Sequence, residues 1–500
     1  MHRLAKLDHQ YVWHPFTQMR DWLRGEPLVI TSGRGALLRD IQGREYLDAN
    51  ASIWTNLHGH NHPRLNAALR RQLNKIAHTS ALGLANEPAS LLAMRLVRSV
   101  NPAAVGPFKT GPSSESGRQR KGRHERRLRA EELCKVFYSD DGSTALEVAL
   151  KMAYEFCRRT GRSRSPRFLS LQGAYHGDTV GAVSLGHIDL FHETYRGLLF
   201  RSDALMAPYC YRCPFNQAQP ERADARQYRC CRWECVEQAK RSFQRQKKRS
   251  NPYAALVLEP LIQGAAGMIA QPEGWLKQIA ELTRSEGALL IADEVMTGFG
   301  RTGDAFEDGT SGRLYACHRE GTQPDLMALS KGITGGYLPL AATLSTATVF
   351  EVFLGEYEEF KTFFHGHSYT ANPLGCATAL ASLDLLETQQ SRNGRQRLER
   401  VLAEALTSLW RFPCIGDIRQ VGLMAGIELV RNWRTREIIP LREKAGIRVC
   451  EAMARRGVLT RPIGNVIVLM PPYCMTARQV CQMVEILESA MAEVFGFSND

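Results

Sequence analysis

Between residues 133 and 345 the sequence alternates short apolar runs with stretches of helical periodicity. Apolar runs cover 288–292 and 326–329, and a helical pattern begins at residue 142 after another short strand pattern. Such alternation is typical of a mostly parallel sheet with helices on its faces. The sequence therefore predicts an α/β fold, in which ligands bind at the carboxyl ends of the strands.

A lysine, Lys331, follows the second apolar run and is surrounded by Ser330, Gly332, Gly335 and Gly336. A charged lysine is costly to bury, but desolvation lowers its pKa and makes the amine a nucleophile. Such an amine can form a Schiff base with a carbonyl compound. A Ser-Lys-Gly triplet alone favours the alternative of a surface lysine in a glycine-rich loop, so the interpretation depends on the preceding strand.

That preceding strand, predicted at 288–292, ends in the acidic pair Asp293-Glu294. A carboxylate at a strand end can hold the protonated ring nitrogen of pyridoxal phosphate, which then acts as an electron sink. A single strand-end aspartate is more often a helix cap. Asp293 followed by Lys331 in the next strand-and-loop unit favours the cofactor site.

A candidate phosphate site occurs earlier, where a strand at 135–138 runs through a turn into a helix. Gly142, Ser143 and Thr144 begin this helix, and free backbone N–H groups together with the helix dipole bind phosphate there. The alternative is an ordinary helix cap. Tyr175, after another short strand, can stack on a cofactor ring or be a buried structural tyrosine.

Six motifs occur in order along the chain: SDDGST, GAYHGDT, EP..QG, ADEV.TGFGRTG, SKG and HGHSYTANPLGCA. This set resembles the class III (ω-amino acid type) aminotransferases, which are pyridoxal-phosphate enzymes of fold type I. The opening YVWHPFTQM and the late RPIGNVIVLMPPY resemble the members that aminate 8-amino-7-oxononanoate to 7,8-diaminononanoate in biotin biosynthesis. The resemblance covers nearly the whole chain apart from two insertions.

The resemblance implies a site shared between the subunits of a homodimer, with Lys331 as the catalytic residue. Arg461 is expected to bind a substrate carboxylate, a role that suits a bidentate guanidinium, although a surface ion pair is the alternative. No metal is expected. The implied cofactor-binding residues are Gly142, Ser143, Thr144, Tyr175, Glu259, Asp293, Lys331 and, from the neighbouring subunit, Ser368; the implied substrate-binding residues are Phe16, Ile53, Trp54, Tyr175, Gly366 and Arg461.

The resemblance also implies a large cofactor domain with a mostly parallel seven-stranded sheet, and a smaller α+β domain made of the N- and C-terminal segments. We expect residues 1–75 and 346–500 to form the small domain and 76–345 the large one. A basic insertion is expected at 103–132 and a cysteine-rich insertion at 208–236.

The basic insertion carries about half of the formal net charge of +13: seven Lys and Arg between Arg118 and Arg129 against Glu125 give +6. Its polar, Gly/Ser-rich composition favours a solvated segment, and nucleic-acid binding is the minority interpretation because no matching motif accompanies it. In the second insertion, Cys210, Cys213, Cys230, Cys231 and Cys235 have near-ligand spacing for zinc, but free thiols are the simpler interpretation. Thirteen cysteines without a signal peptide or a spanning apolar run indicate a reduced, cytoplasmic protein without a membrane segment.

The amino donor stays open between S-adenosylmethionine, the family default, and L-lysine. Members that use S-adenosylmethionine tend to have other residues at Phe16, Ile53, His367-Ser368 and Val468, and the aromatic surface lost there would suit an adenine or sulfonium group. Two alternative functions are a general class III ω-aminotransferase acting on ornithine, lysine or a diamine, and a regulatory nucleic-acid-binding protein on an inactive aminotransferase fold. The intact Lys331 and Asp293 argue against the latter.

Overall fold

The computed structural model describes residues 1–101, 131–303 and 313–497, and its largest element is a sheet of seven strands. The strand order is β4-β12-β11-β10-β7-β5-β6, and only β12 runs antiparallel to its neighbours. The predicted mostly parallel seven-stranded sheet is therefore confirmed. The strands are β4 (Leu133–Ser139), β5 (Arg167–Leu171), β6 (Asp203–Leu205), β7 (Tyr253–Leu258), β10 (Leu289–Asp293), β11 (Leu326–Leu329) and β12 (Ala341–Thr346).

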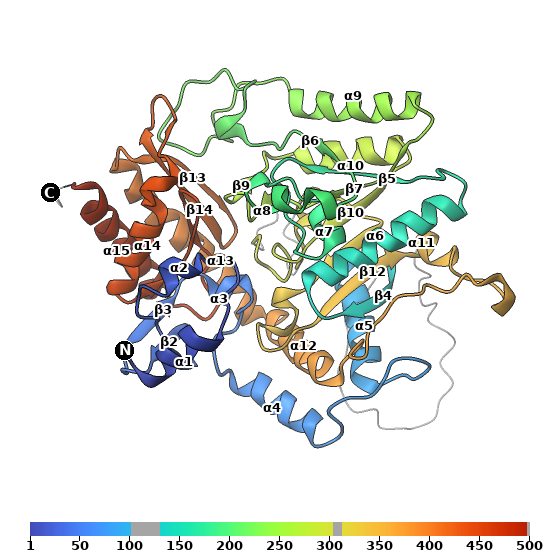
Figure 1. The fold of residues 1–500 in the computed structure, drawn as a ribbon, viewed down its shortest axis with the longest axis horizontal. Helices are drawn as coiled ribbons and strands as arrows, with labels where there is room; N and C mark the ends of the chain where they lie inside the picture. The colour runs from blue at the N-terminus through green and yellow to red at the C-terminus, as the bar shows by residue number, and fades with distance from the viewer. Residues whose placement is uncertain (102–130, 304–312, 498–500) are drawn as a thin grey trace.

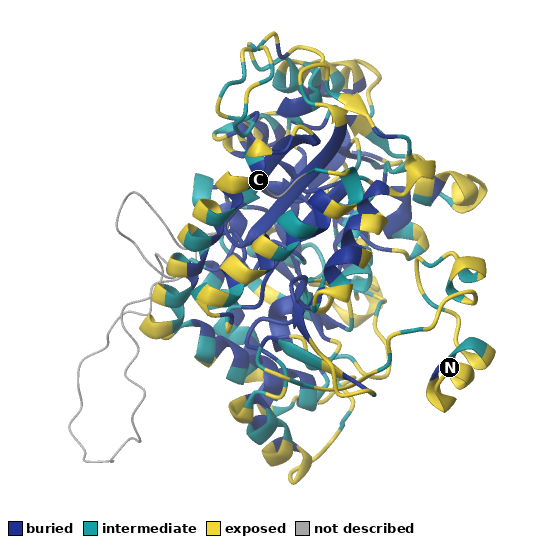
Figure 2. Cartoon of the chain, turned by 90° about the vertical axis from the view of Figure 1, so that its left-hand side faces the viewer, coloured by how far each residue is buried: buried dark blue, intermediate teal, exposed yellow. Residues whose placement is uncertain are grey.

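Helices cover both faces of this sheet, so its central strands are buried on both sides (Figure 2). In β7, Ala255 and Val257 pack against α6 (Gly142–Arg159), whereas Leu256 and Leu258 pack against α10 (Trp275–Ser285). Strands buried on both faces are continuously apolar rather than alternating. The other helices of this region include α4 (Pro63–Leu73), α5 (Glu87–Val100), α7 (Val180–Ser184), α8 (Asp189–His192), α9 (Glu234–Lys248), α11 (Ala347–Glu351) and α12 (Pro373–Leu386), and a short hairpin joins β8 (Ile262–Gln263) to β9 (Ile269–Ala270).

The two ends of the chain come together beside the large sheet, where blue and red segments meet in Figure 1. Strand β3 (Glu45–Asp48) pairs in parallel with β16 (Val458–Leu459), which joins the N- and C-terminal segments as predicted. A second sheet packs with the C-terminal helices around its own apolar core. The remaining elements are α1 (Arg3–Tyr11), α2 (Met19–Trp22), β1 (Ile30–Arg34), β2 (Leu37–Asp40), α3 (Ala51–Trp54), α13 (Gln389–Leu406), β13 (Ile415–Val421), β14 (Met424–Asn432), β15 (Glu437–Ile438), α14 (Ala445–Arg455), β17 (Pro462–Ile463), β18 (Val466–Leu469) and α15 (Ala477–Phe495).

The structure describes the cysteine-rich insertion but almost none of the basic insertion. Almost all of the basic one, residues 102–130, lies outside the described residues. The cysteine-rich one runs without regular strands from β6 toward β13 and β14, and returns to α9 (Figure 1). All thirteen cysteines are free thiols, and no group of three or more metal-binding side chains gathers within the described ranges. Over those same ranges, no helix is long and apolar enough to cross a membrane.

Candidate active site

Lys331 and Asp293 lie at the carboxyl ends of adjacent parallel strands. Asp293 is the last residue of β10 and pairs in register with Ala328 of β11, and Lys331 follows β11 by two residues. The Lys331 side chain is only partly exposed, and burial lowers its pKa while the Asp293 and Glu259 carboxylates act in the opposite direction. Its backbone is left-handed, with φ of 42°, a conformation that a non-glycine residue adopts at a cost of about 1–3 kcal/mol.

Asp293 is held by two hydrogen bonds that aim its carboxylate. Its Oδ2 atom lies 2.7 Å from Nδ1 of His176, and its Oδ1 atom accepts the N–H of Val295 at 3.1 Å. His176 is almost fully buried, and its Nε2 atom has no partner among the residues described. His176 was not predicted as a site residue from the sequence, although it stands in the motif GAYHGDT beside Tyr175.

Glu259 is a second buried carboxyl group on the same side of the sheet. Its Oε2 atom accepts the N–H of Gly264 at 2.7 Å, and in the described structure its Oε1 atom has no partner. Burial raises the pKa of Glu259 to about 7; the neighbouring Asp293 adds to this shift, and His176 and Lys331 oppose it. The adjacent Glu294 instead accepts hydrogen bonds from the N–H groups of Ala316 and Cys317, so its carboxylate stabilises the backbone there.

An anion site was predicted at the start of α6. Asp141 is the N-cap and closes a capping box with Thr144, so the Thr144 hydroxyl and the Thr144 N–H, which was predicted as a phosphate donor, are both already occupied. The N–H groups of Gly142 and Ser143 have no acceptor within the part of the chain that is described. Gly177, with φ of 121°, packs so closely here that an added Cβ would lie 2.0 Å from Oγ of Ser143.

Trp54 borders the lysine, and Tyr175 belongs to a separate aromatic group. The Trp54 ring lies 4.6 Å from Nζ of Lys331, and its Nε1 donates to Oδ1 of Asn50 at 2.8 Å. Trp54 reaches this place because residues 51–54 form a left-handed turn, with φ between 45° and 71°. The Tyr175 ring centroid lies 6.4 Å from that of Phe16 and 6.3 Å from that of Phe191, and Phe191 was not predicted from the sequence.

The remaining predicted residues are exposed. The Ile53 side chain is 46% exposed, and Arg461 is exposed and has no ion-pair partner among the described residues. Gly366 and Ser368 lie in an exposed loop, where His367 is 3.6 Å from Asp140, next to the start of α6. A contribution of Ser368 to a neighbouring subunit stays a prediction.

Known proteins match this chain over almost its entire length. The family model "Aminotransferase class-III" matches residues 22–491. Adenosylmethionine-8-amino-7-oxononanoate aminotransferase of Geobacter sulfurreducens is 46% identical, over 99% of this chain and 98% of that protein. The protein of the same name from Nitratidesulfovibrio vulgaris is 44% identical, over 98% and 82%.

Two solved structures have the same fold. The Methanocaldococcus jannaschii adenosylmethionine-8-amino-7-oxononanoate aminotransferase has a TM-score of 0.83 and 36% identity, over 98% of each chain. An amine transaminase from an uncultivated Pseudomonas species, in its PLP-bound form, has a TM-score of 0.82 and 32% identity, over 97% of this chain and 98% of that one. The chain belongs to the class III aminotransferase family of fold type I enzymes.

Proposed function

We propose that this enzyme transfers an amino group from S-adenosylmethionine to 8-amino-7-oxononanoate, forming 7,8-diaminononanoate in biotin biosynthesis, with pyridoxal phosphate as cofactor. The observation that carries the proposal is the meeting of Lys331 and Asp293 at adjacent strand ends, in a chain whose relatives at 46% and 44% identity are named for this reaction.

The residues present fit the cofactor. Lys331 has no hydrogen-bonded partner within the described ranges, and its lowered pKa favours the uncharged amine that a Schiff base needs. The His176-oriented Asp293 carboxylate can hold a protonated ring nitrogen. The unpaired N–H groups of Gly142 and Ser143 are available for the phosphate, and Tyr175 can flank the ring.

When bound, pyridoxal phosphate supplies an electron-withdrawing ring that takes up the electrons of a broken substrate C–H bond. The Nζ atom of Lys331 removes the proton from the substrate carbon that bears the amine and later returns a proton. The Trp54 ring, whose centroid lies 4.6 Å from Nζ, covers one side of this amine. Arg461, exposed and without an ion-pair partner among the described residues, binds the remote carboxylate of 8-amino-7-oxononanoate, and Phe16, Ile53 and Gly366 line the substrate path.

We infer that the enzyme is a homodimer in which Ser368 of one subunit reaches the phosphate of the other. Exposed apolar side chains on two segments support a subunit interface: Leu82 is 91% exposed, Tyr357 86% and Phe364 67%. Burying such patches is the usual source of association free energy. Sedimentation equilibrium should give twice the monomer mass of 56.1 kDa. The free cysteines agree with a cytoplasmic location.

Half-reactions test the function and the donor. Purified protein loaded with pyridoxal phosphate is mixed with S-adenosylmethionine or with L-lysine, and the absorbance of the bound cofactor is followed. Loss of this absorbance with S-adenosylmethionine, then formation of 7,8-diaminononanoate after 8-amino-7-oxononanoate is added, is the expected result. A response to lysine alone assigns the other donor. A protein that responds only to ornithine or a diamine is a general ω-aminotransferase, a function also found on this fold, as the Pseudomonas amine transaminase illustrates.

A further inference from the structure

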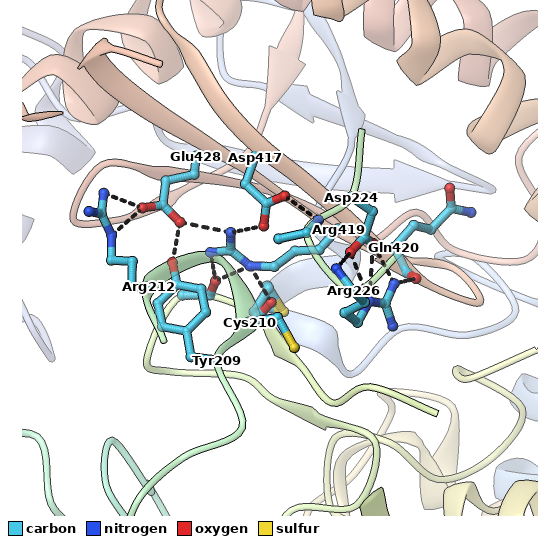
Figure 3. Close-up of polar contacts among 12 residues, drawn as sticks. Tyr209, Cys210, Arg212, Asp224, Arg226, Asp417, Arg419, Gln420 and Glu428 are labelled. Atoms are coloured by element: carbon cyan, nitrogen blue, oxygen red, sulfur yellow. Dashed lines mark hydrogen bonds and ion pairs between the residues drawn. The ribbon is translucent and has the colours of Figure 1, made fainter. Parts of the chain in front are cut away.

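A buried cluster of charged side chains, which we call the Arg419 cluster, joins the cysteine-rich segment to the C-terminal sheet (Figure 3). It consists of Tyr209 and Arg212 from the segment, Asp417 and Arg419 from β13, and Glu428 from β14. Arg419 Nη1 lies 2.7 Å from Oε2 of Glu428 and 3.0 Å from Oδ2 of Asp417. Arg212 Nη2 lies 2.6 Å from Oε1 of Glu428, and the Tyr209 hydroxyl donates to Oε2 of Glu428.

The other side of the Arg419 guanidinium contacts the large domain. Its Nε donates to the Met268 carbonyl at 2.7 Å, and its Nη2 donates to the Gly267 carbonyl at 2.5 Å. These carbonyls belong to the turn 264–268 between β8 and β9. The planar fork of one arginine thus binds two carboxylates of the C-terminal sheet and two carbonyls of the turn, which the single ammonium group of a lysine cannot reproduce.

The turn 264–268 in turn contacts the candidate active site. The N–H of Gly264 donates to Glu259, and a Cβ added at Gly264 would lie 3.2 Å from Cζ3 of Trp54. The Trp54 ring lies against Nζ of Lys331. A displacement of this turn therefore reaches the reacting lysine through one intervening side chain.

The C-terminal sheet also carries Arg461. Strand β14, which holds Glu428, pairs with β18, and β18 pairs with β17, directly after Arg461. A Cβ added at Gly267 would lie 3.1 Å from Cγ2 of Val466 in β18, so this sheet and the turn are in direct contact. Arg419, in β13, thus connects the sheet that carries Arg461 to the turn that contacts Trp54.

We propose that Arg419 is a positioning residue that fixes the separation between Arg461 and Lys331, and thereby sets the length of the carboxylate substrate that the enzyme accepts. The inference rests on the proposed function, in which Arg461 binds the remote carboxylate of 8-amino-7-oxononanoate. A substrate held at both ends reacts well only if its length matches this separation, and a misplacement of about 1 Å can reduce the rate about 100-fold.

The charges of the cluster fit a positioning role. Two guanidinium groups face two carboxylates, and the Arg419 and Arg212 guanidiniums hold the pKa of Glu428 below its usual range although burial alone would raise it. A buried ion-pair network adds little net stability compared with apolar side chains of the same volume. The directional contacts of this network nevertheless fix how the C-terminal sheet lies relative to the turn 264–268.

The test compares Arg419→Lys with wild type on 8-amino-7-oxononanoate and on homologues with one methylene fewer or more between the carboxylate and the carbonyl. Wild type should prefer the natural length. Arg419→Lys should lower kcat/KM for 8-amino-7-oxononanoate about 10- to 100-fold and for the homologues much less, so that the length preference falls at least about tenfold. Tyr209→Phe, which retains Arg419, should shift the preference in the same direction by about two- to fivefold.

Arg222→Lys is the matched control. Arg222 lies in the same segment and donates to the Ile415 and Phe412 carbonyls, each at 2.6 Å, but it does not contact the turn 264–268. It should lower the urea unfolding midpoint and leave the length preference unchanged. If both Arg419→Lys and Tyr209→Phe keep the wild-type length preference, Arg419 is only structural and the proposed function stands. If Arg419→Lys does not fold, Tyr209→Phe alone decides in the same way. If wild type does not aminate 8-amino-7-oxononanoate, the proposed function and this inference both fall.

Discussion

The Nδ1 atom of His176 lies 2.7 Å from Oδ2 of Asp293, and both side chains are almost fully buried. The two residues come from different strand-and-loop units, 117 positions apart in the chain. The ring leaves the carboxylate few orientations, so in the proposed function the carboxylate that holds the cofactor ring nitrogen is oriented before the cofactor binds.

Replacing His176 with phenylalanine should weaken cofactor binding. The aromatic volume is kept, but Asp293 loses a hydrogen bond to a charged group, which is worth about 1.5–3 kcal/mol, or about a 10- to 100-fold change in affinity. Fluorescence titration of the cofactor-free protein with pyridoxal phosphate measures it. The control is His318→Phe, another buried histidine, whose Nε2 contacts the Val100 carbonyl. Unchanged affinity in His176→Phe would show that the contact with Asp293 has no role in cofactor binding.

Replacing Lys331 with alanine should abolish turnover. Loss of the amine removes both the covalent attachment of the cofactor and the proton carrier, and we expect a decrease in kcat of at least about 1,000-fold. Lys240→Ala, on the exposed side of α9, should retain wild-type kcat. The central assignment is wrong if the Lys331 variant transaminates at the wild-type rate.

Glu259 should make the stability of the cofactor-free protein depend on pH. Burial raises its pKa from 4.5 to about 7, so the folded protein binds more protons than the unfolded chain between these values. Its contribution to the free energy of unfolding is present below about pH 4.5 and is lost as the pH rises to 7, by up to about 3 kcal/mol. Urea unfolding at several pH values should show that the free energy of unfolding of Glu259→Gln increases relative to that of wild type as the pH rises. A difference in free energy that stays constant with pH would refute the raised pKa of Glu259.

A methyl group at Gly177 should damage the proposed phosphate site. Alanine there would place Cβ 2.0 Å from Oγ and 2.7 Å from Cα of Ser143, at the start of α6, so one of the two segments must move. Cofactor affinity should decrease by about tenfold or more, beyond the cost of the left-handed backbone of about 1 kcal/mol. Gly161→Ala is the control that carries only the cost of the left-handed backbone, because φ of Gly161 is 69° and no atom lies within 4 Å of an added Cβ. Equal cofactor affinity in the two variants would mean that the contact with Ser143 does not matter.

The sequence by itself determined the class of fold and predicted the candidate reactive groups. Asp293 and Lys331 could be placed because hydrophobic periodicity locates strands, and in parallel sheets the strand ends meet at one edge. The helix start at Gly142 was also predicted, since capping chemistry is local. These local signals do not decide which amino donor the residues at Phe16, Ile53, His367-Ser368 and Val468 favour. They also do not decide the role of the basic insertion.

Only the tertiary structure brought His176 to Asp293, Phe191 to Tyr175, and Arg419 to the turn 264–268. These contacts join segments separated in the chain, and their distances depend on how loops and domains pack rather than on local propensity. Trp54 is a clear case: its place beside Lys331 depends on a left-handed turn at residues 51–54 that contains no glycine, so no local residue preference predicts it. Sequence periodicity thus located the candidate reacting groups, and long-range packing decided how they are oriented and which residues support them.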